Sequence, residues 1–399
     1  MAIAATIGIS LAAAALVVGA AGAALEWQYR RRPGNDLDVP PGEWNREILS
    51  PERHQLVGIV EFRNRTPNLE IMLPEVRAQV SLLSETSVDD IHTRVRVVPL
   101  HPDAPAREDG YWFGYIVKIG KSTRAKIAID IEGNDLDRLK SAWVKIHYVT
   151  YGPEGRIPKV RHVVIPLQHP DPSVAPNPRT VPENGAEVFP IKTHLLTHLD
   201  DPVEIVKRYV LPHAQPGDIV TLGETPVAIM QDRWRHPSDV RPGWVARRLC
   251  YYFLPTSSLA TACGLQTLVD LVGPGRVFFA FVGGAIARAF GYRGGFYQLA
   301  GEQARLIDDV TGTLPPYDSF IVLGPNRPEQ VVADIQRETG LSAAIVDVND
   351  LKAVKILAGT PDLSTAFLET ALRSNPAGNA DEQTPVVLIR PGKTASGQL

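Results

Sequence analysis

The residues with the clearest chemical potential lie in the stretch 302–325, EQARLIDDVTGTLPPYDSFIVLGP. The adjacent carboxylates Asp308 and Asp309 are followed by Thr311, a glycine and a second threonine. Two ionised carboxylates repel each other, so a fold that holds them together commonly does so to bind a cation or to share a proton. The stretch therefore predicts a hard-metal and phosphate site. It is also typical of an Asx-type turn between a helix and a strand, and the local sequence leaves both interpretations open.

Two further polar segments follow apolar runs in the same half of the chain. Glu224 and Thr225 come shortly after the run 219–222, and Asp347 lies in an apolar run that continues into further carboxylate and amide residues. Sheets in α/β proteins bind ligands at the carboxyl ends of their strands, so these segments are candidates for ligand contacts. The alternative for Glu224 and Thr225 is an ordinary helix N-cap.

The elements that must position these residues fit an α/β (α+β) domain over residues 188–392. Apolar runs predict short strands at 188–192, 219–222, 343–348 and 386–389. Asp201-Pro202-Val203-Glu204 predicts a capped helix start, and amphipathic periodicity predicts a helix over 328–339 that ends at Gly340. The run 277–282 is predicted as a buried strand, because flanking arginines leave it too short for a membrane span.

Residues 50–168 predict an all-β, immunoglobulin-like sandwich, because seven short runs at regular spacing alternate polar and apolar side chains. His147 and His162 each stand alone on such a run and are interpreted as surface or hydrogen-bonded histidines. Residues 169–187 hold five prolines and no apolar periodicity, which indicates a semi-rigid linker between the two domains.

The amino terminus predicts a transmembrane anchor over residues 1–29. Residues 1–25 carry no charged side chain, and three arginines follow at 30–32. Positive charge after the span places the remaining chain on the cytoplasmic side, as a single-pass membrane protein. A cleavable signal peptide is the alternative, although it normally carries its positive charge before the apolar segment.

Composition limits the remaining functions. The 41 basic residues nearly balance the 44 acidic ones, which gives no electrostatic support for nucleic-acid binding. Cys250 and Cys263 alone cannot form a four-ligand zinc site or a disulfide framework, and we interpret both as buried thiols.

Four short segments, in their order along the chain, resemble the coenzyme F420-0:L-glutamate ligase (γ-glutamyl ligase) family, and in particular a bacterial ligase-like branch of it. The resemblance covers about residues 187–392 and rests on the segments Phe189–Thr193, Pro216–Val220, Glu224–Arg233 and Asp309–Gly312. It implies a ligase that uses GTP and a divalent metal, Mg²⁺ or Mn²⁺. Such an enzyme joins a small-molecule carboxylate to glutamate through an acyl phosphate, and a homodimer is one assembly that the resemblance allows.

The resemblance also implies roles for individual residues. Asp309 and Lys192 would be catalytic, and Asp308, Asp309 and Thr311 would bind the metal. The nucleotide would lie against Pro190, Lys192, Thr193, Glu224 and Thr225. This chain has Glu224 where archaeal members of the family carry a lysine. A catalytically inactive ligase fold that serves as a scaffold or binding module at the membrane is therefore the competing hypothesis.

Overall fold

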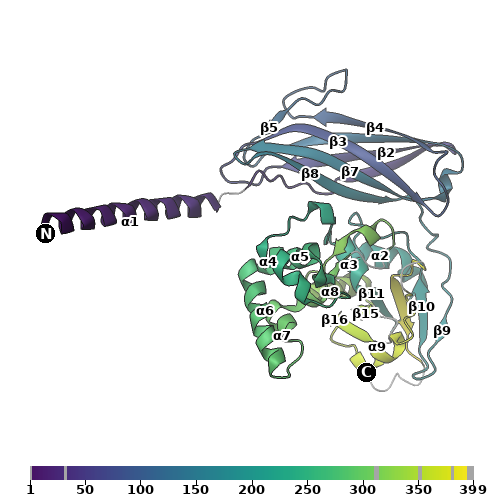
Figure 1. The fold of residues 1–399 in the computed structure, drawn as a ribbon. Coiled ribbons are helices and arrows are strands. Elements are labelled where there is room, and N and C mark those ends of the chain that lie inside the picture. The colour runs from purple at the N-terminus through teal and green to yellow at the C-terminus, as the bar shows by residue number, and fades with distance from the viewer. Residues whose placement is uncertain (1, 31–33, 310–313, 349–352, 379–381, 393–399) are drawn as a thin grey trace.

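The structure is a computed structural model that describes residues 2–30, 34–309, 314–348, 353–378 and 382–392, with side chains described from residue 14 onward except at 29 and 30. Figure 1 shows three parts in chain order: the helix α1 (Ala2–Arg30), a β-sandwich and a mixed α/β domain.

The sandwich consists of two antiparallel four-stranded sheets packed face to face. One sheet has the strand order β1 (Glu43–Ser50), β2 (Arg53–Arg63), β6 (Ser122–Glu132) and β4 (His92–Leu100). The other has the order β5 (Tyr115–Val117), β3 (Ile71–Ser84), β7 (Leu139–Gly152) and β8 (Gly155–Pro166). The predicted strands are present, and β1 is an additional strand before them.

Alternation of side chains explains why these strands pack as two layers. In β2, Leu56, Val60 and Phe62 are buried, while their neighbours along the strand are only half-buried. Successive side chains on a strand point to opposite faces, so this pattern gives each sheet one apolar face. Those faces meet in a single core that also contains Ile127 and Val144.

The second domain is built on a six-stranded mixed sheet. Its order is β16 (Val354–Gly359), β15 (Ser342–Val348), β11 (Ile219–Gly223), β17 (Val386–Arg390), β10 (Glu187–Ile191) and β9 (Arg179–Thr180). The strands β11 and β15 are parallel, and the other neighbours are antiparallel.

Helices cover both faces of this sheet. Val220 and Leu222 of β11 belong to the same core as α2 (Pro202–Tyr209) and α8 (Pro328–Thr339). Ile219, which points to the other face, packs with residues of α9 (Thr365–Leu372). A sheet that is buried on both faces needs apolar side chains at successive positions, which explains the continuous apolar runs in the sequence.

The predicted helix signals are confirmed at the ends of two helices. The carboxylate of Asp201 accepts hydrogen bonds from the backbone N–H groups of Val203 and Glu204 at the start of α2. Gly340 ends α8 with φ of 75°, a left-handed conformation that glycine adopts without steric cost.

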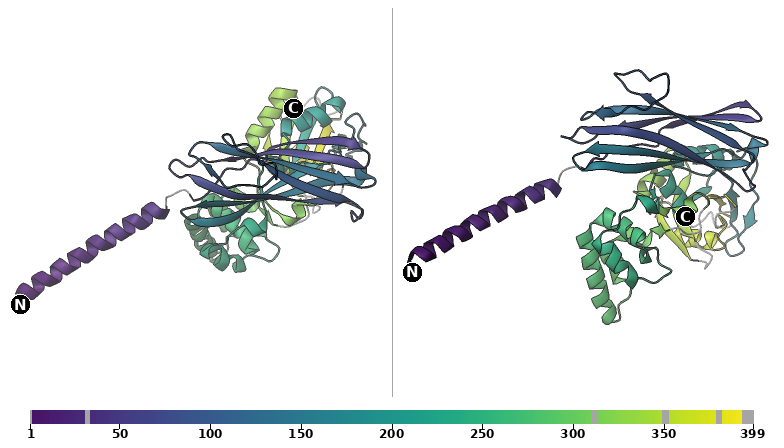
Figure 2. Two further views of the ribbon diagram at one scale, coloured as in Figure 1. Left: turned by 90° about the horizontal axis from the view of Figure 1, so that it is seen from above. Right: turned by 45° about the horizontal axis from the view of Figure 1, so that its top comes forward.

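The prediction of a buried strand over 277–282 is wrong, because this segment lies within the helix α6 (Pro274–Ala289). Val277 and Ala280 are buried one helical turn apart, a spacing that suits one face of a helix. The apolar run was too short for its periodicity to distinguish a strand from a helix. Together with α4 (Trp244–Leu249), α5 (Ala262–Val272) and α7 (Gly295–Ala300), α6 forms a helical lobe beside the sheet (Figure 2).

In the described part of the chain, no single helix combines the length and the apolar character needed to cross a bilayer. The part of α1 whose side chains are described, Ala14–Gln28, is apolar but shorter than a membrane span. The helices α5 and α6 meet the length and composition requirement only as a pair, and they are bent by 112° relative to each other. The transmembrane anchor over residues 1–29 stays a prediction that these helices do not support.

The sandwich and the α/β domain share a small core. Val164 of β8 is buried together with Trp234, Tyr317 and Phe320 of the α/β domain, and Trp143 of β7 packs against the same cluster. At the edge of this core, the guanidinium of Arg161 donates a hydrogen bond of 2.6 Å to the carboxylate of Asp232. These contacts hold the two domains side by side, as Figures 1 and 2 show.

Candidate functional site

A pocket of about 320 Å³ lies at the carboxyl ends of the two parallel strands of the α/β domain. Its wall is formed by the segment after β11, the end of β15, and the connections around α9 and before β17. This is the edge of the sheet at which α/β folds bind ligands.

The strand register explains why two carboxylates meet at this edge. Gly223 of β11 lies opposite Val346 of β15 in the parallel ladder. The next residue on each strand is acidic, so Glu224 and Asp347 extend from neighbouring strands into the same pocket.

A third carboxylate comes from a separate small sheet. The strand β13 (Asp308–Asp309) pairs with β14 (Ile321–Val322), which also pairs with β12 (Trp234–Arg235). This sheet brings Asp308 to the pocket wall, where it faces the ends of β11 and β15. Segments far apart in the sequence thus contribute three carboxylates to one pocket.

The three carboxylates interact strongly. Burial, followed by the charges of Asp347 and Asp308, raises the pKa of Glu224 to about 8, although the nearby Lys355 acts in the opposite direction. The side chain of Asp308 is exposed, but the surrounding pocket wall removes much of its hydration. This desolvation, followed by the charge of Asp347, raises the pKa of Asp308 to about 6. The free pocket is therefore short of positive charge, which a bound cation would supply.

The donor set suits a hard divalent cation. Mg²⁺ and Mn²⁺ prefer carboxylate and other oxygen ligands, and Glu224, Asp308 and Asp347 offer three carboxylates in one place. The hydroxyl of Thr225 also lines the pocket. None of the described lining residues is a lysine or an arginine, so within that part of the chain a phosphate group would depend on the cation for charge neutralisation.

The candidate site residues from the sequence do not all lie in one place in the structure. Thr193, Glu224, Thr225 and Asp308 line the acidic pocket. Pro190 and Lys192 line a different, smaller pocket beside the linker, and Lys192 is exposed there. Thr311 lies outside the described residues.

Asp309 is not among the residues that line the acidic pocket. It is buried, and its carboxylate accepts a hydrogen bond from the hydroxyl of Thr261, the residue that caps α5. Burial raises the pKa of Asp309, and the hydrogen bond from Thr261 partly offsets this effect. Within the described residues, Asp309 therefore has a structural contact rather than a place in the pocket.

The segment around Asp347 was a candidate for ligand contacts, but neither Asp347 nor Lys355 was given a role at the site from the sequence. They lie opposite each other in the antiparallel pair β15 and β16. The signal that could have identified Asp347 is the parallel pairing of two apolar strands that both end at an acidic residue. That register becomes visible only once the sheet is formed.

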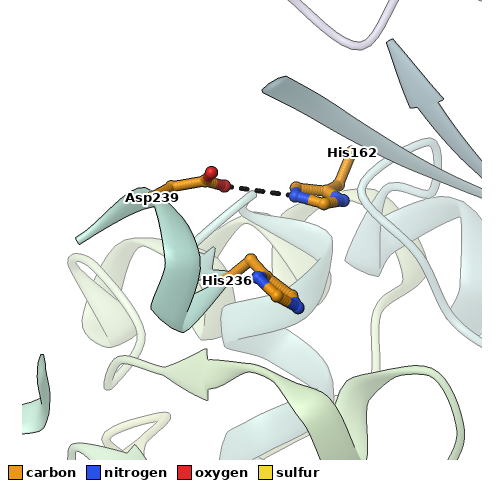
Figure 3. Close-up of side chains that lie close together, drawn as sticks. All are labelled: His162, His236 and Asp239. Carbon is orange, nitrogen blue, oxygen red and sulfur yellow. Dashed lines mark hydrogen bonds and ion pairs between the residues drawn. The ribbon is translucent and has the colours of Figure 1, made fainter. Parts of the chain in front are cut away.

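A second group of possible metal ligands lies between the two domains. His162, His236 and Asp239 each place one ligand atom within 4.8 Å of the others (Figure 3). However, the indole of Trp143 donates to Nδ1 of His162 at 3.1 Å, and the backbone N–H of Ser238 donates to Nδ1 of His236 at 3.2 Å. Each neutral ring then carries its proton on Nε2, and His162 donates that proton to Asp239 at 3.1 Å. This cluster serves as a hydrogen-bonded contact between the domains.

By architecture, the molecule belongs to the class in which a β-sandwich precedes a mixed α/β domain with a ligand pocket at the strand ends. Residues 38–169 match the family model described as the N-terminal Ig-like domain of F420-0:gamma-glutamyl ligase. This match confirms the Ig-like character of the sandwich and supports the γ-glutamyl ligase family at a coarse level. It covers the sandwich and not the acidic pocket.

Similarity to solved structures is weak. The GAE domain of GGA2p from Saccharomyces cerevisiae is 8% identical, with 34% of this chain and 94% of that chain covered and a TM-score of 0.21. A FixG-related protein from Vibrio parahaemolyticus is 14% identical, with 33% and 96% covered and a TM-score of 0.16. TM-scores this low carry no argument about function. No curated protein matches the chain.

Proposed function

We propose that this protein is an amide ligase of the γ-glutamyl ligase kind that depends on a divalent metal ion and on GTP. In this reaction, a substrate carboxylate oxygen attacks the γ-phosphorus of GTP, GDP leaves, and an acyl phosphate forms. The amine of glutamate then attacks the acyl carbon, phosphate leaves, and the amine loses a proton. The coarse family match at the sandwich and the resemblance of residues 187–392 both favour this chemistry.

The observation that carries the proposal is the meeting of three carboxylates from separate strand ends in one pocket. Phosphoryl transfer asks a protein mainly to position its substrates and to provide cations that neutralise phosphate charge. A divalent ion would supply that charge when it is bound.

Individual residues of the chain have distinct tasks in this proposal. Glu224, Asp308 and Asp347 would hold the ion, and Asp309 would not take part. Thr225 lines the same pocket and would orient an oxygen ligand. The apolar side chains of Ile229 and Leu314 line it as well and limit the access of water to a reactive acyl phosphate.

A turnover assay with the full-length chain tests the proposal. The protein is incubated with Mn²⁺, GTP, glutamate and a panel of small carboxylic acids, and the release of GDP is measured. We expect release that requires metal, glutamate and one of the acids. Asp308→Asn should lower it roughly a hundredfold, because a charge held in place for the transition state is lost. Asp318→Asn, at an exposed carboxylate outside the pocket, is the matched control.

A non-catalytic binding module is the second candidate. The observation in its favour is that the described lining residues include no lysine or arginine, and that Glu224 stands where the archaeal enzymes carry a lysine. Binding of Mn²⁺ and GTP without GDP release, under every combination of glutamate and carboxylic acid, would favour this candidate over the ligase.

A further inference from the structure

The helical lobe of residues 244–300, formed by α4 to α7, exposes large apolar side chains. Tyr251 is 85% exposed, Phe279 is 72% exposed and Phe290 is 87% exposed. Trp244 and Leu254 are also exposed by more than 60%. A monomeric soluble protein rarely presents so many large apolar side chains on one part of its surface, unless that part binds a partner or a membrane.

On α6 the exposed apolar residues follow the period of the helix. Phe279, Val282, Ile286 and the capping residue Phe290 are spaced by three, four and four positions, so they form one stripe along the helix. The core of the lobe is complete without them, because Val277 and Ala280 occupy the buried face and pack with α5 and α7. The stripe is therefore an additional surface rather than part of the core.

The charge of the lobe is opposite to that of the whole chain. The formal net charge of the protein is −3, but residues 244–300 contain five arginines and a single carboxylate, Asp270. All five arginines are exposed, whereas Asp270 is paired with Arg235 at 2.6 Å. The lobe thus combines exposed apolar side chains with exposed cations, and Arg288 and Arg293 lie two residues before and three residues after Phe290 in the sequence.

Aromatic and aliphatic side chains next to arginines are the composition of surfaces that bind anionic lipid. The apolar side chains enter the boundary between headgroups and acyl chains, and the arginines contact lipid phosphates. Figures 1 and 2 show the lobe set beside the six-stranded sheet with its outer helices away from the sandwich.

We propose that the lobe of residues 244–300 docks on an anionic phospholipid bilayer, with the stripe on α6 at the headgroup boundary and the exposed arginines of the lobe on phosphates. This contact is separate from the predicted anchor over residues 1–29 and does not depend on the proposed enzymatic activity.

Because α1 could hold the chain on vesicles by itself, the test must report on the lobe alone. A polarity-sensitive fluorophore is attached to the full-length protein at Phe290→Cys, in a Cys263→Ser background that removes the half-buried native thiol; Cys250 is buried. The control carries the fluorophore at Glu329→Cys, an exposed position on α8. Vesicles of phosphatidylglycerol, of phosphatidylcholine, and of phosphatidylglycerol with brominated acyl chains are then added.

On phosphatidylglycerol, the emission at position 290 should shift to shorter wavelength and be quenched by brominated chains, while position 329 stays unchanged. Arg288→Glu should raise the lipid concentration for half-maximal shift roughly tenfold, whereas Arg373→Glu, at the exposed carboxyl-terminal cap of α9 outside the lobe, should not. The proposal would be overturned if the protein sedimented with the vesicles while the emission at position 290 stayed at the wavelength seen in water. An equal response to phosphatidylcholine would also overturn it.

A second copy of the chain is the alternative occupant, and it gives a different result. The emission at position 290 would then shift without lipid as the protein concentration rises, and the mass measured by light scattering would double. That outcome would also overturn the lipid proposal.

Discussion

Asp308 and Asp309 are adjacent carboxylates with different surroundings. Successive residues of a strand point to opposite faces, so the two-residue strand β13 directs Asp308 to the acidic pocket and Asp309 towards Thr261 at the start of α5. The first side chain lines the pocket proposed to bind the metal, and the second links β13 to a helix.

We expect different losses from the two carboxamide variants. Asp308→Asn should weaken Mn²⁺ binding at least tenfold and leave the free energy of unfolding nearly unchanged or slightly higher, because it removes repulsion among the pocket carboxylates. Asp309→Asn should retain Mn²⁺ binding and lose about 1–2 kcal/mol of stability, since a charged acceptor of the Thr261 hydroxyl is lost. Calorimetric titration and urea unfolding of both variants provide the comparison. If instead Asp309→Asn lost Mn²⁺ binding and Asp308→Asn kept it, Asp309 and not Asp308 would be the metal ligand.

His198 should make the protein sensitive to acid. It is buried, neither ring nitrogen has a hydrogen-bond partner among the described residues, and burial followed by the charge of Arg161 lowers its pKa to about 3. The unfolded chain binds a proton near pH 6.5 and the folded protein does not. The contribution of His198 to stability is therefore complete above pH 6.5 and is lost as the pH falls towards 3.

His198→Phe should remove this acid sensitivity. At pH 4.5 the variant should be more stable than the wild type by about 2 kcal/mol, while at pH 7.5 the two should be similar. Urea unfolding at both pH values measures the difference. His92→Phe, at an exposed position, is the control and should change neither value appreciably. Equal acid sensitivity in wild type and His198→Phe would show that other groups cause it.

At the scale of single residues, the sequence predicts which residues line the pocket better than it predicts where each side chain points. Glu224, Thr225 and Asp308 were singled out, and the structure places all three at one pocket. The sequence could not show that Asp309 faces away, because this depends on the pairing of a two-residue strand. It also could not place Lys192, which follows β10 and lines the pocket beside the linker.

At the scale of elements, the parallel ladder between β11 and β15 brings Glu224 and Asp347 to the same pocket. Both strands could be predicted from their apolar runs, but their adjacency could not, because long stretches of chain separate them. For the helix α6, the type of element itself could not be predicted from the sequence. Its short apolar run suited a strand as well as a helix, and only the packing of Val277 and Ala280 within the lobe distinguishes the two.

The junction of α5 and β13 offers a prediction at this scale. A Cβ atom at Gly264 would lie 2.1 Å from the carbonyl oxygen of Ser258 and 3.1 Å from the carboxylate of Asp309. Gly264→Ala should therefore force these segments apart and cost about 1–3 kcal/mol. Gly275→Ala on α6 is the matched control, because no other atom lies within 4 Å of its added Cβ.

Thermal and urea unfolding should show a lower stability for Gly264→Ala and no loss of stability for Gly275→Ala. Gly275→Ala should be neutral or slightly stabilising, since alanine favours a helix over glycine. A Gly264→Ala protein as stable as the wild type would show that α5 does not pack closely against Ser258 and Asp309.

At the scale of the whole molecule, the sequence predicts the order of the domains but not their contact. Trp143 and Val164 of the sandwich and Phe320 of the α/β domain each fit an ordinary apolar pattern in the sequence. In the structure they share one small core, beside the ion pair of Arg161 and Asp232. Contacts between domains involve few residues and have no periodicity, so sequence patterns do not reveal them.

We expect this shared core to make the two domains unfold together. The ring of Phe320 lies 5.4 Å from that of Trp143 and 5.3 Å from that of His162, both on the sandwich, and 4.7 Å from that of Trp234. Phe320→Ala should cost about 3–5 kcal/mol and should split a single calorimetric transition into two.

Phe281→Ala in the lobe, away from the domain contact, should lower stability without separating the transitions. Two transitions already present in the wild-type protein would mean that the domains are thermodynamically independent.

The most direct test of the acidic pocket is the binding of Mn²⁺ measured by electron paramagnetic resonance, which reports the free ion. The full-length protein should bind one tightly held Mn²⁺, more strongly at pH 8.5 than at pH 6.5, because protons compete for Glu224 with its pKa of about 8. GTP should strengthen this binding, and the double variant Glu224→Gln, Asp347→Asn should lose it while Asp318→Asn keeps it. Binding that is absent in the wild type, or that survives the double variant, would contradict the assignment of a metal and nucleotide site to this pocket.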